Sequence, residues 1–445
     1  MKHSFYSVIL FNTFLWAQQP DCDRAWTEFA SGLYEEALTS VEQCIASDTT
    51  NYRGFFLKGR TLENLYRHND AITALQKALR LNPDSRETKS ALASLYLFSG
   101  QPEISAQFYE QLATAEPHIN RWKISWATAL MAARNFHNAL EQLLIVEQTD
   151  TTNWLVYKNM GDCYFRLDSL WQTYDSYYKA LNLNPNNKNL WGTLTGLLVS
   201  NDESEGAITV GNEAISIDST NVEVWRFLGV AYYKSGSRSR ALNALGMALA
   251  LGDSSLTTVS HYGILNYHQA QNRNNLLDYL EAEKYLEKAY QLDPNNITII
   301  NYLVSTYGYT HARTRNGQKG LDILDELDVV VANFDSIGMR ANIQRGHLLR
   351  MMMRNREAAN AFIAATKDFP DDLRNFYEVA FCFDRADDKR LAIEWYTRYL
   401  EKNDPNWATR QWTEQELIQN ELVNFVRRRI DTLRTDLFFE GRLQE

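Results

Sequence analysis

Long apolar stretches are missing from this sequence. No segment reaches the roughly 18 consecutive apolar residues of a membrane-spanning helix, so we expect no membrane span. Basic residues are in deficit as well, because 45 Lys and Arg stand against 55 Asp and Glu and leave a net charge of −10. Nonspecific binding to nucleic acid requires a basic face, so we expect no nucleic-acid partner.

Motifs for catalysis are also absent. The chain has no His-Glu-x-x-His, no Cys-x-x-Cys, no glycine-rich phosphate loop and no Gly-x-Ser-x-Gly. Its eight histidines are scattered. His261 and His268 are seven residues apart and would share a helical face, which leaves a paired metal site as an alternative. We therefore expect no enzyme activity, no cofactor and no metal, and binding is the expected function.

The N-terminal residues have the pattern of a secretory signal peptide. A short basic start at Lys2 is followed by the mostly apolar stretch Phe5–Trp16, and Ala17 supplies a small residue at a cleavage position. The alternative is that this apolar stretch remains in the protein and covers the first of the helical repeats described below. Cys22 lacks the small neighbours of a lipoprotein cysteine, so we expect an exported protein, periplasmic or secreted, without a lipid anchor.

A repeated unit makes up most of the chain, and Tyr52–Ser85 is its clearest copy. These 34 residues have the pattern of two helices, with Gly59 where the helices approach closely and an Asn-Pro-Asp turn at the end. Steps of 34 from Pro83 land on equivalent turns, and turns such as Asp48–Asn51 and Asp150–Asn153 echo one another. Small residues recur midway along the first helices, at Ala93, Ala127, Gly161, Gly229, Gly263, Gly346 and Ala380. Neither helix can bury its apolar face alone, so the copies must stack.

This pattern resembles the tetratricopeptide repeat family. The resemblance implies an all-α fold, a right-handed superhelical solenoid of about 11 helix-turn-helix repeats with a C-terminal capping helix. The expected organisation is a signal peptide at 1–17, a degenerate first repeat at 18–51, six regular repeats at 52–255, two enlarged repeats with insertions at 256–338, two repeats at 339–406 and the capping helix at 407–445.

Cysteines are few, at four in the chain. Cys22 and Cys44 fall on the two helices of the first hairpin, where a disulfide would staple the terminal repeat in an oxidising compartment. The alternative is a pair of small buried thiols. Cys163 and Cys382 follow first-helix small residues by two positions, and we expect both to be buried.

The family uses its concave groove, lined by first helices, to hold extended peptides or helices. Positions three before or one after each small residue, with nearby tyrosines, are expected to face that groove. The groove candidates are Phe56, Arg60, Lys158, Asp162, Arg226, Tyr233, Tyr267 and Tyr377. The alternative is that several of them only pack between repeats. No Asn follows a small residue, so a clamp for a C-terminal carboxylate is not expected.

The enlarged repeats carry extra length at Gln269–Leu280, at Tyr309–Gly317 and within Asp328–Gly338. Insertions in neighbouring hairpins fall side by side, so we expect loops that form one rim beside the groove. The rim candidates are Arg273, Tyr279, Tyr309, Arg313 and Arg315. Neutral drift is the alternative, because doubling a loop costs only about 0.6 kcal/mol.

The tail is expected to close the stack. Thr413 and Glu416 form a capping box, and an apolar face follows at Leu422, Phe425, Val426, Ile430, Leu433 and Leu437. Arg427–Arg429 should lie outside that face, in solvent, and a basic docking patch is the alternative.

The whole sequence thus predicts an exported, non-catalytic scaffold that binds protein partners in a groove, and a multiprotein envelope complex is one setting in which it would do so. The alternative is a cell-envelope or polysaccharide-assembly adaptor that binds glycan or an export machine. The partner itself is not named by the sequence.

Overall fold

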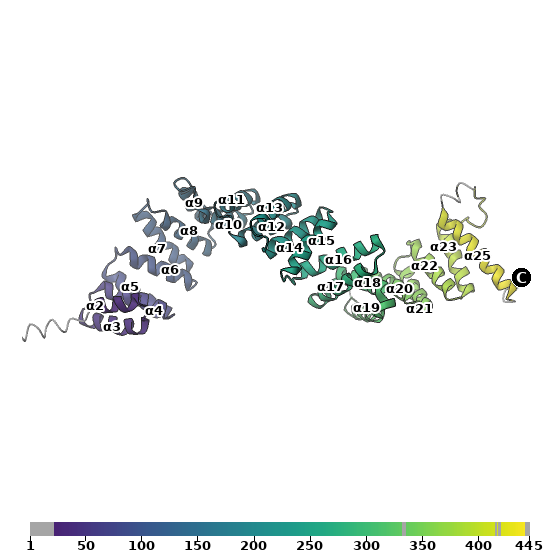
Figure 1. Cartoon of the computed structure of the whole chain (residues 1–445), viewed down its shortest axis with the longest axis horizontal. Coiled ribbons are helices and arrows are strands. Elements are labelled where there is room, and N and C mark those ends of the chain that lie inside the picture. The colour runs from purple at the N-terminus through teal and green to yellow at the C-terminus, as the bar shows by residue number, and fades with distance from the viewer. Residues whose placement is uncertain (1–21, 332–334, 414–415, 417–419, 441–445) are drawn as a thin grey trace, which may run out of the picture. The chain divides into compact units, whose positions relative to one another are not determined.

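Helices account for all the regular structure that the computed structural model describes, which covers residues 22–331, 335–413, 416 and 420–440. The expected signal peptide at 1–17 lies outside these residues. Within them are 23 helices, and no residue is in a strand. Helices that follow one another pair into hairpins, and within each of the two compact units described below neighbouring hairpins contact one another (Figure 1). The prediction of an all-α stack of helical hairpins is confirmed.

The chain divides into two compact units, at Leu190 and Trp191. The first unit contains five hairpins: α2 and α3 (Cys22–Ala30, Tyr34–Ser47), α4 and α5 (Tyr52–Asn64, His68–Leu81), α6 and α7 (Arg86–Phe98, Pro102–Ala115), α8 and α9 (Asn120–Ala132, Phe136–Glu147), and α10 and α11 (Trp154–Arg166, Leu170–Leu183).

The second unit continues the same arrangement, with α12 (Lys188–Ser200) beginning just before the division. Its further helices are α13 (Ser204–Ile217), α14 (Val222–Lys234), α15 (Arg238–Ala250), α16 (Leu256–Arg273), α17 (Leu276–Leu292), α18 (Ile297–Thr314), α19 (Gly317–Val331), α20 (Asp335–Met351), α21 (Asn355–Asp368), α22 (Leu373–Arg385), α23 (Lys389–Asn403) and α25 (Glu421–Phe439).

The turns between hairpins are built by the side chains that echo in the sequence. Asp48 Oδ1 accepts a hydrogen bond from Thr50 N at 2.9 Å, and Asp150 does the same with Thr152 N at 3.0 Å. The Asn51 side chain then accepts from the first backbone N–H groups of α4, which have no partner within the helix. One short motif therefore ends one hairpin and starts the next.

The turn within each regular hairpin depends on a residue with positive φ. Glycine fills this position at Gly32, Gly100 and Gly236, but Tyr66 and Arg134 adopt it as well, with φ of 59° and 60°. A positive φ is unfavourable for residues with a Cβ. The interlocked helices on both sides hold these residues in that conformation.

The enlarged hairpins correct the prediction of inserted loops. α16 and α18 each have 18 residues where α14 has 13, and α17 has 17 where α15 has 13. The turns themselves stay short, at Asn274–Asn275 and Arg315–Asn316. The extra residues lengthen the helices by about one turn, because helix satisfies their backbone hydrogen bonds internally and a buried face is available to cover them. Residues 332–334, within the third expected insertion, lie outside the described part of the chain.

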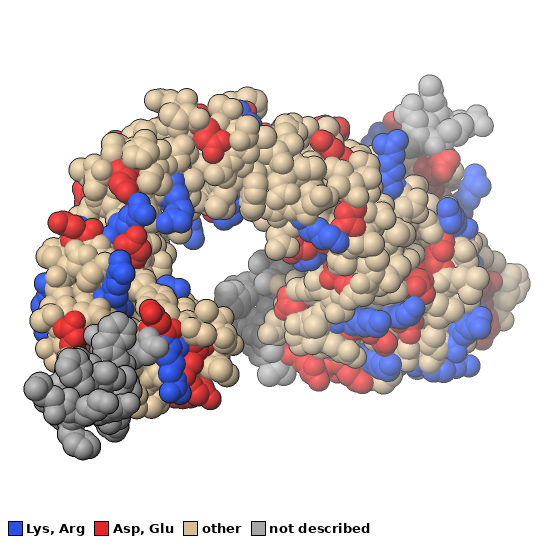
Figure 2. All heavy atoms as spheres, turned by 60° about the vertical axis from the view of Figure 1, so that its left-hand side comes forward, with Lys and Arg blue, Asp and Glu red and all other residues tan. Residues whose placement is uncertain are grey.

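The surface carries charges of both signs. In the view of Figure 2, Lys and Arg side chains are interspersed with Asp and Glu side chains, and wide areas between them are uncharged. This intermixing agrees with a soluble helical surface.

The tail ends in α25, which covers α23. Its buried side chains are Val423, Val426, Ile430, Leu433 and Leu437. Leu422 and Phe425 are exposed, at 42% and 47%, so their predicted place on the apolar face is wrong. Thr413 and Glu416 do exchange the two hydrogen bonds of a capping box, but α25 itself begins at Glu421.

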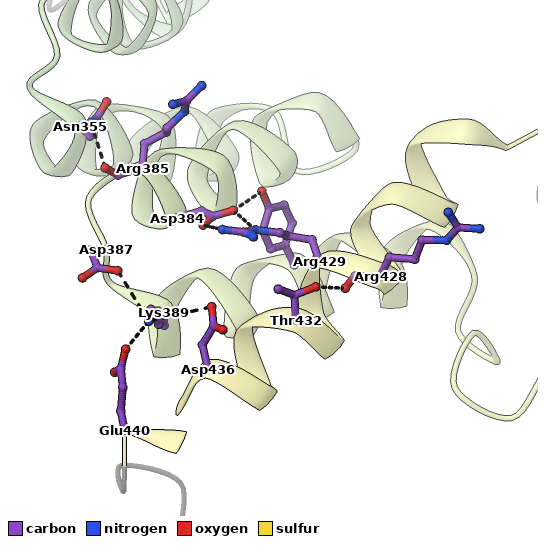
Figure 3. Close-up of polar contacts among 11 residues, drawn as sticks. Asn355, Asp384, Arg385, Asp387, Lys389, Arg428, Arg429, Thr432, Asp436 and Glu440 are labelled. Atoms are coloured by element: carbon purple, nitrogen blue, oxygen red, sulfur yellow. Dashed lines mark hydrogen bonds and ion pairs between the residues drawn. The ribbon is translucent and has the colours of Figure 1, made fainter. Parts of the chain in front are cut away.

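Ion pairs fasten α25 to the last hairpin (Figure 3). The Arg429 guanidinium donates two hydrogen bonds to the Asp384 carboxylate, at 2.8 and 2.7 Å. Lys389 lies between Asp436 and Glu440 of the tail and donates to Glu440. Arg429 therefore belongs to the contact with α22, and its predicted place in solvent is wrong.

Candidate functional site

The first hairpin contains a disulfide between Cys22 and Cys44, whose Cα atoms are 5.4 Å apart. The Asn51 side chain lies against both sulfurs. Cys163 and Cys382 are free and fully buried, and burial raises the pKa of each thiol to about 12. These two thiols are therefore inert packing groups.

A first cleft, which we call the arginine cleft, lies on the first helices of three successive hairpins of the first unit. Its volume is about 470 Å³. The lining residues come from α4, α6 and the start of α8: Phe56, Arg60, Arg86, Glu87, Ser90, Ala91, Ser94, Ile119, Arg121 and Trp122. Both sequence-predicted groove residues of α4, Phe56 and Arg60, are among them.

Glu116 organises one end of the arginine cleft. Its carboxylate accepts a hydrogen bond from Trp122 Nε1 at 2.7 Å and another from the Arg86 guanidinium at 3.1 Å. These bonds hold the pKa of Glu116 below its ordinary value. The guanidinium of Arg121 lies over the Trp122 ring, 4.2 Å from its centroid. Arg86 is thus already neutralised, whereas Arg121 has an aromatic partner instead of a carboxylate.

The wall of the arginine cleft that Phe56 forms packs against the disulfide-bonded hairpin. The Phe56 ring lies 6.3 Å from the ring of Trp26 on α2, and Trp26 in turn contacts Phe29. The first hairpin therefore supports this wall, and the disulfide joins its two helices.

A second cleft, which we call the tyrosine cleft, lies on the first helices of the second unit, and its volume is about 260 Å³. The lining residues come from α16, α18 and α20: Tyr267, Val304, Ser305, Tyr309, Gln344, His347, Leu348, Arg350 and Met351. Tyr267 was predicted for the groove and Tyr309 for the rim, and the structure brings the two together.

Stacked tyrosine rings form part of the tyrosine cleft and of the packing beneath its lining. Tyr279 and Tyr309, one from each lengthened hairpin, stack with ring centroids 4.4 Å apart and planes 11° apart. Tyr267 lies edge-on to both rings and to Tyr302. Tyr279 is only 5% exposed, while Tyr309 is 42% exposed. Burial raises the pKa of Tyr267 to about 12, so this phenol is neutral at physiological pH.

The polar groups of the tyrosine cleft carry little net charge. Burial and, to a smaller extent, the nearby Arg350 together lower the pKa of His347 to about 4. Arg350 pairs with Glu378 at 3.1 Å, so its charge is compensated. Gln344 accepts from Ser305 at 3.3 Å. At neutral pH the cleft offers amide, hydroxyl and imidazole groups beside aromatic rings.

The remaining predicted groove residues are engaged elsewhere. Lys158 pairs with Asp162 at 2.6 Å, and Arg226 Nε lies 3.1 Å from Asp253. Tyr233 meets His261 edge-on, and Tyr377 contacts Phe381, Tyr396 and Tyr399. None of these residues lines the arginine cleft or the tyrosine cleft.

The predicted rim arginines are exposed and lie outside both clefts. Arg273 lies 4.0 Å from Asp278 near the α16–α17 turn. Arg313 is close to the end of α18, and Arg315 is its turn residue with a φ of 59°. Lengthened helices carry these side chains to the turns, away from the cleft-facing positions.

Sequence reasoning missed Arg86, Arg121 and Trp122 in one cleft and Gln344 and Arg350 in the other. The positional rule considered only the middle of each first helix, whereas Arg121 lies in the first turn of α8. A usable signal was present, because steps of 34 from Arg53 land on Glu87 and Arg121. A charged residue thus recurs in the first turn of three consecutive first helices.

Comparison with known families agrees with this architecture. Models of the tetratricopeptide repeat match residues 52–85, 265–296 and 344–406. The chain therefore contains tetratricopeptide repeats over these residues.

Among curated proteins, the chain is 22% identical to the peroxisomal targeting signal receptor of Kluyveromyces lactis, over 48% of this chain and 38% of that protein. It is 28% identical to the Hsp70-Hsp90 organizing protein of Triticum aestivum, over 24% of this chain and 18% of that protein. The chain therefore spans less than half the length of these relatives. Among solved structures, MamA from Desulfovibrio magneticus RS-1 is 18% identical, with 37% of this chain and 93% of that chain covered and a TM-score of 0.35.

In the described part of the chain, no helix combines the length and apolarity that crossing a membrane requires. The same residues contain no group of three or more His, Cys, Asp or Glu side chains placed to hold a metal ion.

Proposed function

We propose that this chain is an exported, non-catalytic scaffold that holds an extended peptide or a helix of a partner protein against its first helices. The observation that carries the proposal is the position of the two clefts. One is lined from α4, α6 and α8 and the other from α16, α18 and α20, all of them first helices of their hairpins. Stacked repeats present such a surface continuously, which suits an elongated ligand.

The side chains of the tyrosine cleft favour a peptide over a glycan. Gln344, Ser305 and Arg350 offer donors and acceptors for peptide groups, and tyrosine with arginine is typical of binding hot spots. A glycan platform needs open aromatic faces. The Tyr279–Tyr309 stack supports that alternative, a polysaccharide-assembly adaptor, but Tyr279 is buried and only Tyr309 presents a ring to solvent.

Two further observations support the proposal. A disulfide between Cys22 and Cys44 agrees with an oxidising compartment, and therefore with export. Two of the relatives are named for protein ligands, as a receptor for a targeting signal and as an organiser of Hsp70 and Hsp90. Neither relationship covers enough of those proteins to transfer a particular partner.

Site-specific photocrosslinking in the native host tests the binding mode. A photoreactive amino acid replaces Ser305 in the tyrosine cleft, and a matched control replaces the exposed Lys288 on α17, a second helix. We expect protein adducts from position 305 and none from 288, identified by mass spectrometry. Glycan adducts at 305 would establish the adaptor alternative, and equal labelling at both positions would contradict a groove-binding scaffold.

Export is tested separately by the intact mass of the protein recovered from the native host. We expect a chain that begins at Gln18 or within a few residues of it, with the Cys22–Cys44 bridge formed. Recovery of the full-length chain from the cytoplasm would contradict export.

A further inference from the structure

We propose that the arginine cleft recognises an acidic segment of the partner protein, with carboxylates from two positions of one extended stretch bound by Arg121 and Arg60. This inference rests on the proposed scaffold function and names the ligand chemistry of the arginine cleft.

Arg121 supplies the first binding group. It is exposed in the first turn of α8, and within the described residues it forms no ion pair. Its guanidinium is held 4.2 Å above the Trp122 ring, and Trp122 is fixed by its hydrogen bond to Glu116. A stacked guanidinium keeps its N–H donors free at the ring edge, where they can bind a carboxylate with two parallel hydrogen bonds. Arg121 is thus oriented in advance but not neutralised.

Arg60 supplies the second binding group. Its one acidic contact is Glu63, one turn further along the same helix, at 3.1 Å. The Arg60 side chain is 37% exposed, and ion pairs of this kind on a helix surface contribute little. A ligand carboxylate can therefore compete for Arg60 at small cost.

Arg121 gives the lining a cation that is available to an anion. Three of the ten lining residues are arginine and one is glutamate, but Glu116 and Glu87 pair with Arg86 and Glu63 pairs with Arg60. The tyrosine cleft has a single arginine, which Glu378 compensates. A guanidinium that contacts an aromatic ring instead of a carboxylate therefore distinguishes the arginine cleft, while the surface visible in Figure 2 mixes both signs. Low-dielectric walls such as Phe56 strengthen the attraction to an anionic ligand.

The distance between the two helices sets the spacing in the ligand. α6 lines the cleft between α4 and α8, and if each helix-to-helix step is about 8–10 Å, as for packed helices, the ligand must span roughly 16–20 Å. An extended chain rises about 3.3 Å per residue. The two acidic positions should therefore be separated by about five residues, with an apolar side chain between them for Phe56 and Ile119.

The probe that tests this is a fluorescein-labelled ten-residue peptide with acidic residues at its second and seventh positions and leucines between. Its control has the matching amides, Asn and Gln, in their place. Fluorescence polarisation with the full chain should give about tenfold tighter binding of the acidic peptide at low salt, and the preference should shrink as salt screens the charges. Equal affinity for both peptides, or no binding of either, would overturn the inference.

Substitutions of single arginines test whether the preference for the acidic peptide arises in the arginine cleft. Arg121→Gln should weaken the acidic peptide about tenfold and leave the amide peptide unchanged, and Arg60→Gln should act in the same direction but less. Arg313→Gln removes an exposed arginine of the other unit and should change neither affinity. Equal weakening by Arg313→Gln and Arg121→Gln would show a nonspecific charge effect and overturn the proposal.

A photocrosslinker at Ser94, in the arginine cleft, separates this inference from the proposed function. Adducts at 305 but not at 94 would leave the scaffold function standing and remove the acidic-segment inference. Adducts at neither position would remove both. Adducts at 94 that Arg121→Gln abolishes, while those at 305 persist, are the result we expect.

Discussion

The arginine cleft and the tyrosine cleft occupy the same kind of place on different hairpins, yet they differ in chemistry. The first is lined by helices of 13 residues and presents three guanidinium groups, those of Arg86 and Arg121 from first turns and that of Arg60 from the middle of α4. Two of the three helices that line the second have 18 residues, and in this cleft Tyr309 stacks on the buried Tyr279.

This difference shows how clefts of different chemistry can be built on one repeat fold. The hairpin packing decides where a cleft forms, because first helices of neighbouring repeats always meet on the same face. Helix length and the side chains of the first turn decide what the cleft can bind. Lengthening two adjacent hairpins together changes the cleft without disturbing the stack.

Replacement of Tyr279 is expected to cause the largest loss of stability, and that loss should be confined to the tyrosine cleft. Tyr279→Ala should cost roughly 3–5 kcal/mol, because a buried ring is lost from the contact between the lengthened hairpins. Hydrogen exchange should speed up in 256–314 and stay unchanged around the arginine cleft. Leu277→Ala, on the same helix but 66% exposed, is the control and should change stability by less than about 0.5 kcal/mol.

Loss of the Cys22–Cys44 disulfide should destabilise the first hairpin and, through it, the arginine cleft. Replacing both Cys22 and Cys44 by Ser should destabilise the first hairpin by about 3 kcal/mol, since the bridge closes a loop with a sequence separation of 22. Hydrogen exchange should increase in 22–47 and, through Trp26, at Phe56 of the arginine cleft. Faster exchange in the tyrosine cleft would contradict the independence of the two clefts.

A pair of glycine substitutions tests the helix packing that both clefts share. A Cβ on Gly229 would lie 2.5 Å from Leu245 Cδ2, so Gly229→Ala should cost about 1–3 kcal/mol through overpacking. A Cβ on Gly246, in the same hairpin, would meet only Tyr262 at 3.7 Å. Gly246→Ala should therefore be neutral or stabilising by up to about 1 kcal/mol, as judged from the two melting temperatures. The comparison fails if both substitutions have the same effect.

The smallest expected effect is a dependence of folding stability on pH. It should arise in the tyrosine cleft alone, since no histidine lines the arginine cleft. The pKa of His347 is about 4 in the folded chain and 6.5 ordinarily. The unfolded chain binds the extra proton between these values, so stability is lost as pH falls from 6.5 towards 4. With partial exposure taken into account, the loss is about 1–2 kcal/mol. His347→Gln should flatten this part of the pH–stability curve, and an unchanged curve would contradict the assignment.

The repeat architecture could be predicted because its signals are local. Asp48, Thr50 and Asn51 contact one another within a few residues, and the same short motif recurs at Asp150 and Asp218. Gly59 marks a close approach because a Cβ there would lie 2.5 Å from Leu75 Cγ. Such constraints act inside one hairpin and are repeated in each copy, so the period is visible without the structure.

The sequence by itself thus determined the all-α stack of hairpins and the positions of the regular repeats. The tertiary structure decided that the extra residues of 256–331 extend helices, because only packing between hairpins supplies the surface that those turns bury. It also decided which side chains share a cleft. Arg60, Arg86 and Arg121 lie on three helices of three hairpins, and only the stacking of those hairpins brings them to one surface. No local pattern records that meeting, because it depends on contacts between residues that are tens of positions apart.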